Sequence, residues 1–120
     1  MINEFQRCSH WIQAALDKGN DTHNIEHIFD GLVRGDFQFW ANEECCVITE
    51  VIDYPKKRVL HIFLAGGSLE AISDLEEDAI KWAKSIGCTD FTLSGRKGWL
   101  RALRDNGWED LNQHQMVKRI

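Results

Sequence analysis

Gly66, Gly67 and Ser68 lie where a strand-like run of residues changes into a helix-like run. Many proteins hold a phosphate at such a glycine break, because free backbone N–H groups at a helix N-terminus attract an anion. The same break can also be a tight corner that needs residues without a Cβ atom. We favour the corner, and we keep an anion nest at these three residues as the alternative.

Glu50 and His61 are the side chains whose types suit proton transfer. They lie in VITEVI and VLHIF, two neighbouring strand-like runs. A carboxylate or an imidazole there could act as a general base if its pKa were tuned. Because residues alternate between the two faces of an antiparallel sheet, both side chains can instead point to the outer face without a role. We favour the outer face.

Other histidine and cysteine patterns are weaker. His23 and His27 are four residues apart and can share a helix face, but zinc needs more ligands and no H-E-x-x-H motif surrounds them. Cys45 and Cys46 have no base identifiable nearby, and we interpret them as buried strand residues. The sequence predicts no metal site.

One basic cluster with flanking tryptophans stands out in GRKGWLRALRDNGW. Such a cluster could bind a phosphate group, nucleic acid or an acidic protein surface, and Trp beside Arg is typical of protein–protein hot spots. A solvated helix face is an equally good interpretation. The candidate interaction residues are Arg96, Lys97, Trp99, Arg101, Arg104 and Trp108.

The bulk composition fits one domain over residues 1–120. The 120 residues are 43% hydrophobic, with five Trp and six Phe for a core. The net charge of −5 disfavours nucleic acid as a partner. The four cysteines lack disulfide or zinc spacing, and neither a leader nor a membrane-length apolar run is visible, so we expect reduced thiols in a cytoplasmic protein.

The chain divides into alternating helix and strand patterns. Apolar spacing predicts helices over 3–18 and 24–35, the second capped by Asp21 or Thr22. Aromatic and β-branched runs predict strands at 37–41, 45–54 and 58–65, forming an antiparallel meander. A further helix follows Gly67 and ends at Gly87, and its start carries a capping box from Ser73 to Glu76.

The rest of the chain completes a mixed sheet. We predict a strand at 88–94, a short helix at 99–106 and a weak strand in 108–120. The order α-α-β-β-β-α-β-α-β predicts an α/β or α+β domain with a β-α-β crossover after the meander.

This order resembles the fold of the GCN5-related N-acetyltransferases (GNAT), with WAKSIGCTDFTLS and WLRALRDNGWE as the most similar stretches. The resemblance runs from about His23 to the end, and the family's first strand has no clear counterpart. ITEVIDYPKKRVLHIFLAGG and GCTDFTLSGRKGW are also similar to small GNAT-like proteins of bacteriophages, including those found among virion genes. Some of those proteins serve in particle assembly.

The resemblance implies an acyl-CoA pyrophosphate loop with the pattern Arg/Gln-x-x-Gly-x-Gly/Ala. Counting back from Gly87 places this loop on GSLEAI, where Gly67 takes the basic position and Glu70 and Ile72 take the small ones. Many family members carry a tyrosine general acid where this chain has Leu103. The loop and the acid are therefore both altered.

We predict a non-catalytic interaction or assembly role, encoded by a bacteriophage, in the host cytoplasm or the virion. We expect no cofactor and a protein partner or self-association, with the helix in residues 1–20 as an interaction element. The alternative is an acetyltransferase that holds acetyl-CoA at Gly66–Ser68 and uses Glu50 or His61 as base. A third interpretation is a small-ligand regulatory module.

Overall fold

The computed structural model describes residues 2–95 and 97–120, and it contains four α-helices, one 3-10 helix and four strands among them. The elements in chain order are α1 (Ile2–Asp17), α2 (Ile25–Arg34), β1 (Phe37–Ala41), β2 (Cys45–Asp53), β3 (Arg58–Gly67), α3 (Leu69–Ser85), β4 (Cys88–Leu93), α4 (Lys97–Leu103) and η1 (Arg104–Asn106). Arg96, one of the predicted interaction residues, lies outside the described residues.

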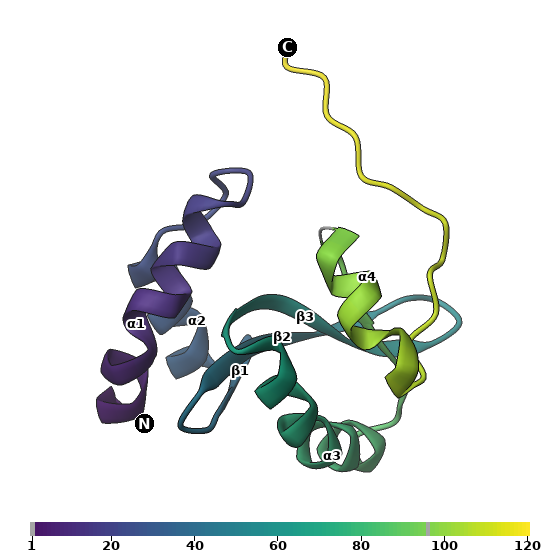
Figure 1. Cartoon of the computed structure of the whole chain (residues 1–120), viewed down its shortest axis with the longest axis horizontal. Helices are drawn as coiled ribbons and strands as arrows, with labels where there is room; N and C mark the ends of the chain where they lie inside the picture. Colours follow the sequence, from purple (N-terminus) through teal and green to yellow (C-terminus); the bar gives the residue numbers. More distant parts are fainter. Residues whose placement is uncertain (1, 96) are drawn as a thin grey trace.

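The strands form one sheet in the order β1-β2-β3-β4 (Figure 1). β1, β2 and β3 pair antiparallel, and β3 pairs with β4 in parallel after the α3 crossover. The predicted meander and β-α-β unit are therefore confirmed. The short turn at Pro55 is closed by a hydrogen bond from Tyr54 N to Lys57 O of 2.8 Å.

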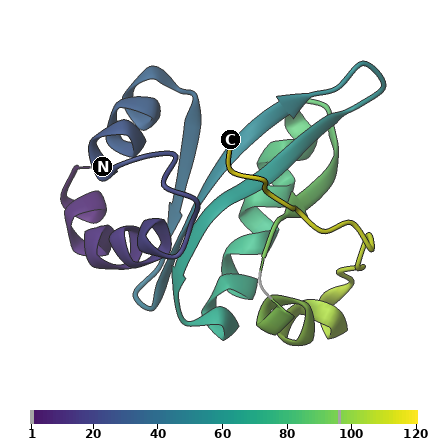
Figure 2. The same ribbon diagram turned by 90° about the horizontal axis from the view of Figure 1, so that it is seen from above.

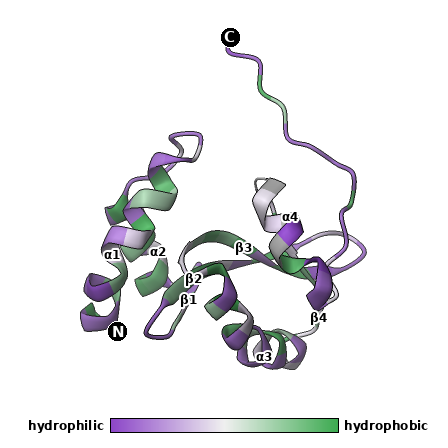
Figure 3. Ribbon diagram, viewed as in Figure 1, coloured by the Kyte–Doolittle hydropathy of each residue, from purple (hydrophilic) through white to green (hydrophobic). Residues whose placement is uncertain are grey.

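Helices cover both faces of the sheet, and successive β2 residues face opposite layers. Cys46 and Ile48 pack under α1 and α2, whereas Cys45 and Val47 pack under α3. Figures 1 and 2 show α1 and α2 together at the β1 side and α3 on the opposite face. Figure 3 shows much hydrophobic colour on the strands and mixed colours on the helices. This alternation explains why β2 begins with a run of buried residues.

The predicted cap of the second helix is wrong. Asn24, not Asp21 or Thr22, caps α2: its side chain accepts from His27 N at 3.0 Å, and the His27 ring accepts from Asn24 N at 3.0 Å. The reciprocal bonds form a capping box in which histidine replaces the usual Glu or Gln. His27 therefore has a structural task at the helix start.

The final predicted strand is also wrong, because residues 108–120 form no strand. A strand needs a partner, and this segment pairs with no part of the sheet within the described chain. The observed order thus ends at α4 and η1. No helix among the residues described combines the length and apolar character needed to cross a membrane.

Candidate functional site

The corner between β3 and α3 is closed by packing on both sides of its two glycines. A Cβ atom on Gly66 would lie 2.7 Å from Trp11 Cβ in α1. A Cβ atom on Gly67 would lie 2.2 Å from the main-chain oxygen of Glu44 and 2.7 Å from Cys45 Cα. Gly67 also has a φ of +91°, a conformation that favours glycine. The glycines allow α1 and the β1–β2 turn to approach β3 closely.

Ser68 uses its polar groups within the corner. Its N–H donates to Glu44 O at 2.9 Å, and its Oγ accepts from Ala71 N at 3.4 Å as the N-cap of α3. The predicted capping box from Ser73 to Glu76 is wrong, because α3 begins at Leu69. Ser73 lies inside the helix, and its hydroxyl donates to Glu70 O at 2.8 Å.

The last four of the six residues aligned with the family's pyrophosphate loop, Leu69–Ile72, are helical. Ile72 is 2% exposed and packs in the core with Cys45 and Val47, so it cannot line a surface loop. Glu70 lies in the first turn of α3 and is the acidic residue of that turn. A helix N-terminus favours anions, but a carboxylate there competes with a bound phosphate. This corner does not fit the pyrophosphate of an acyl-CoA.

Glu50, His61 and Thr92 form a polar row across three strands. Glu50 lies opposite His61 in the β2–β3 pair, and His61 lies opposite Thr92 in the β3–β4 pair. The His61 Nδ1 is 2.8 Å from Thr92 Oγ1. Burial lowers the pKa of His61, and the Glu50 carboxylate opposes part of that shift. The two predicted bases are thus neighbours, and a neutral imidazole here could accept a proton.

β3 and β4 separate beyond this row. Their pairing ends at Ile62 and Leu93, while β3 continues to Gly67. A register shift in the β2–β3 pair leaves Phe63 without a partner residue, since Ile48 pairs with Leu64 and Thr49 with Ile62. Such a bulge bends a strand and increases its twist. Residues 63–67 of β3 therefore have no β4 residue beside them.

The two tryptophans of the predicted interaction cluster face inward. Trp99 and Trp108 are half-buried and pack on the α3 side of the sheet. The Trp108 indole N–H donates to Glu76 Oε1 at 2.9 Å, and its ring centroid lies 5.2 Å from that of Phe91. Arg101 and Arg104 are exposed. Lys97 begins α4. Among the cluster side chains that the structure describes, Arg101 and Arg104 are more accessible than the tryptophans.

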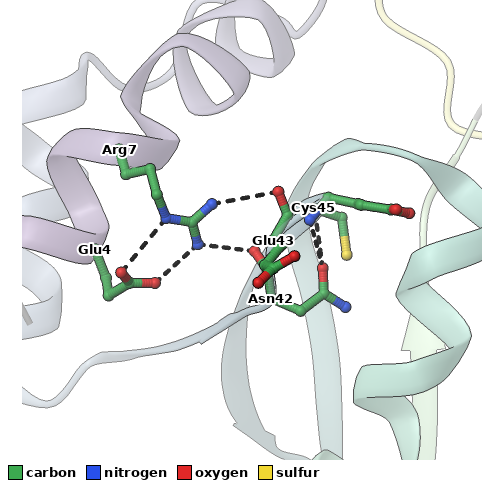
Figure 4. Close-up of polar contacts among 6 residues, drawn as sticks. Glu4, Arg7, Asn42, Glu43 and Cys45 are labelled. Atoms are coloured by element: carbon green, nitrogen blue, oxygen red, sulfur yellow. Dashed lines mark hydrogen bonds and ion pairs between the residues drawn. The ribbon is translucent and has the colours of Figure 1, made fainter.

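Sequence reasoning missed the network centred on Asn42 (Figure 4). The Asn42 side-chain oxygen accepts from Glu44 N at 3.0 Å and Cys45 N at 2.9 Å, and its amide donates to Ala71 O at 3.1 Å. Arg7 of α1 donates to Asn42 O at 2.8 Å and is paired with Glu4. An Asn at the start of a turn is a known signal for such bonds. This network joins α1, the β1–β2 turn and α3.

The cysteines are all free and buried. Burial raises the pKa of Cys45 and, more strongly, that of Cys46, which disfavours the nucleophilic thiolate. The interpretation of both as core residues is confirmed. Within the described residues, no group of three or more His, Cys, Asp or Glu side chains could hold a metal ion.

Comparison with known proteins identifies the fold. No family model and no curated protein matches the sequence. A mutant of the Thermus thermophilus protein TTHA1254 superposes with a TM-score of 0.67 at 17% identity, covering 96% of this chain and 92% of that one. A Trypanosoma brucei acetyltransferase superposes with a TM-score of 0.60 at 13% identity, covering 79% of this chain and 78% of that one.

A third structure is a predicted acetyltransferase of Clostridium acetobutylicum with acetyl-CoA. It superposes with a TM-score of 0.62 at 13% identity, covering 78% of this chain and 71% of that one. The chain therefore has a mixed α+β fold of the acetyltransferase (GNAT) type, as its sequence predicts. At these identities the likeness establishes the fold, and many functions share one fold.

Proposed function

We propose that this chain is a non-catalytic interaction protein on a GNAT-like fold that serves in the assembly or structure of a bacteriophage particle. The observation that carries the proposal is the corner at Gly66–Ser68. The space where Cβ atoms would lie at its two glycines is occupied by Trp11 and by the main chain of Glu44. The Ser68 N–H already donates to the Glu44 carbonyl. The part of the fold that would hold a pyrophosphate instead joins three elements of the protein itself.

Leu103 adds support from a second position. The resemblance aligns it with the tyrosine that many family members use as a general acid, and here it is 3% exposed in the interior. A buried leucine supplies no proton, so this position contributes packing rather than chemistry. The phage context rests on the sequence resemblance alone.

An acetyl-CoA-dependent N-acetyltransferase is the second candidate. The open edge of β3 at residues 63–67 and the neighbouring pair Glu50–His61 favour it. In that case the β3 backbone could hold the extended arm of the cofactor, and Glu50 or His61 could take a proton from an amine. The altered corner gives this candidate no site for the pyrophosphate, and for that reason we rank it second.

The interaction role predicts that the chain co-purifies with particles of the phage that encodes it, at a constant ratio to the capsid protein. Exchanging charge at both exposed arginines, Arg101→Glu with Arg104→Glu, should reduce incorporation by about tenfold if they meet an acidic surface. The matched control is Lys81→Glu with Lys84→Glu on α3, which should leave incorporation unchanged. Quantitative mass spectrometry of gradient-purified particles is the measurement. Absence of the wild-type chain from both finished particles and assembly intermediates would refute the role.

A further inference from the structure

Residues 108–120 leave the body of the protein as an extended segment (Figure 1). Apart from Trp108, its apolar side chains are more than half exposed: Leu111 at 68%, Met116 at 91%, Val117 at 63% and Ile120 at 117%. Isolated exposed apolar residues are common, but four on one short segment are an association signal. Burial of these side chains against a partner would remove their apolar surface from water.

The start of the segment is fixed beside β4. Trp108 is held by Glu76 and lies against Phe91 of β4. Asp110 Oδ1 then accepts from Asn112 N at 2.8 Å, and Asn112 has a φ of +56°. Beyond this turn, the chain continues as an extended segment that rises away from the sheet (Figure 1). The segment therefore begins at β4 and does not pair with it.

β4 is an edge strand of six residues. The sheet order is β1-β2-β3-β4, so within the described chain β4 pairs with β3 alone. An edge strand presents a row of unpaired N–H and C=O groups on which a further extended segment can form a ladder. The start of the free segment, at Trp108, thus lies against β4 on each protein molecule.

The charges of the two parts are complementary. Residues 113–120 contain Lys118 and Arg119 and no acidic residue, whereas the chain as a whole carries −5. α3 packs beside β4; nearer its start it carries the exposed acids Asp74, Glu77 and Asp78, whereas its exposed lysines, Lys81 and Lys84, lie nearer its end. Opposite charge attracts the segment to the β4–α3 side of a protein molecule and helps to fix its register.

We propose that residues 113–120 of one copy add as a strand to the β4 edge of a second copy, and that the exchange is reciprocal. The turn at Asp110–Asn112 disfavours pairing of the segment with its own β4. Because each copy carries both a donor segment and an acceptor edge, a single two-fold axis can satisfy both, and the contact closes as a dimer. The proposal is independent of whether the protein binds acyl-CoA.

The test is the oligomeric state of the full chain, measured by light scattering after size exclusion over a range of concentrations. Wild type should be a dimer. Met116→Pro with Val117→Pro removes two backbone donors from an exposed segment and should raise the dimer dissociation constant by at least about tenfold. Met116→Ile with Val117→Ile keeps the donors and the strand propensity, and should remain dimeric.

Hydrogen exchange at β4 completes the test. The amides of residues 88–93 that face away from β3 should be protected in the wild-type dimer and should exchange faster in the proline variant. A monomeric wild type, or a dimer that the prolines leave intact, would overturn the proposal. Protection of β4 in a monomer would assign the segment to its own sheet, and open-ended polymers would assign it to another edge; either result also overturns it.

Discussion

Gly67→Ala is expected to lower the free energy of unfolding by about 3–5 kcal/mol, combining a clash in a packed interior with an unfavourable positive φ. The new Cβ atom would lie 2.2 Å from Glu44 O and 2.7 Å from Cys45 Cα, both of which are backbone atoms. Backbone cannot rotate away as a side chain can, so β2, β3 or the helix start must shift. Chemical denaturation measures the loss.

Gly87→Ala is the matched control. Gly87 has a φ of +89°, close to the +91° of Gly67, but a Cβ atom added at Gly87 would have no heavy atom within 4 Å beyond its chain neighbours. This variant should lose only the conformational term, about 1–2 kcal/mol. The difference between the two variants then isolates the steric contribution. Equal losses would show that the Gly67 corner is not closed by packing.

Asn42→Ala is expected to lower the free energy of unfolding by about 2–4 kcal/mol, because it leaves two N–H groups without their acceptor and removes the bond that a helix carbonyl accepts in addition to its helical one. The groups concerned are the Glu44 and Cys45 amides and the Ala71 carbonyl. The loss should loosen the contact between the β1–β2 turn and α3. Equilibrium denaturation, with hydrogen exchange at residues 44 and 45, measures both effects.

Two variants bracket this result. Asn42→Asp keeps the acceptor oxygen and loses the donor to Ala71, so its loss should lie between zero and that of alanine. Asn20→Ala removes an exposed amide in the loop after α1 and should change stability by less than about 0.5 kcal/mol. If Asn42→Ala changes the free energy of unfolding as little as Asn20→Ala does, the network of Figure 4 does not stabilise the fold.

The sequence predicted the helices, the meander and the crossover because their patterns are local and strong. It failed at the start of α3 for a tertiary reason. Ser73 with Glu76 is the better local capping motif, but Ala71 and Ile72 are buried in the core. Burying them as part of the helix face requires α3 to begin at Leu69, with Ser68 as its cap.

The candidate site was only partly predictable. The sequence placed Glu50 and His61 on neighbouring strands, and the register adds that they lie opposite each other. The Thr92 contact depends on a parallel strand 31 residues away. Position 67 requires glycine because the main chain of Glu44 packs against it, and no local sequence pattern connects these two residues. Trp99 and Trp108 were predicted to flank an interaction surface. The sequence does not show whether a tryptophan is a core residue or a surface anchor, and only their packing on the α3 side of the sheet identifies them as core residues.

The central claim is that the Gly66–Ser68 corner is a packed joint rather than a site for acyl-CoA. Titration of the wild-type chain with acetyl-CoA, followed by calorimetry and by thermal unfolding, tests it most directly. Ligand that binds only the folded state at a hundred times its Kd would add about 2.7 kcal/mol of stability. We predict no saturable heat and no rise in Tm at millimolar acetyl-CoA. A saturable heat with a concentration-dependent rise in Tm would contradict the claim.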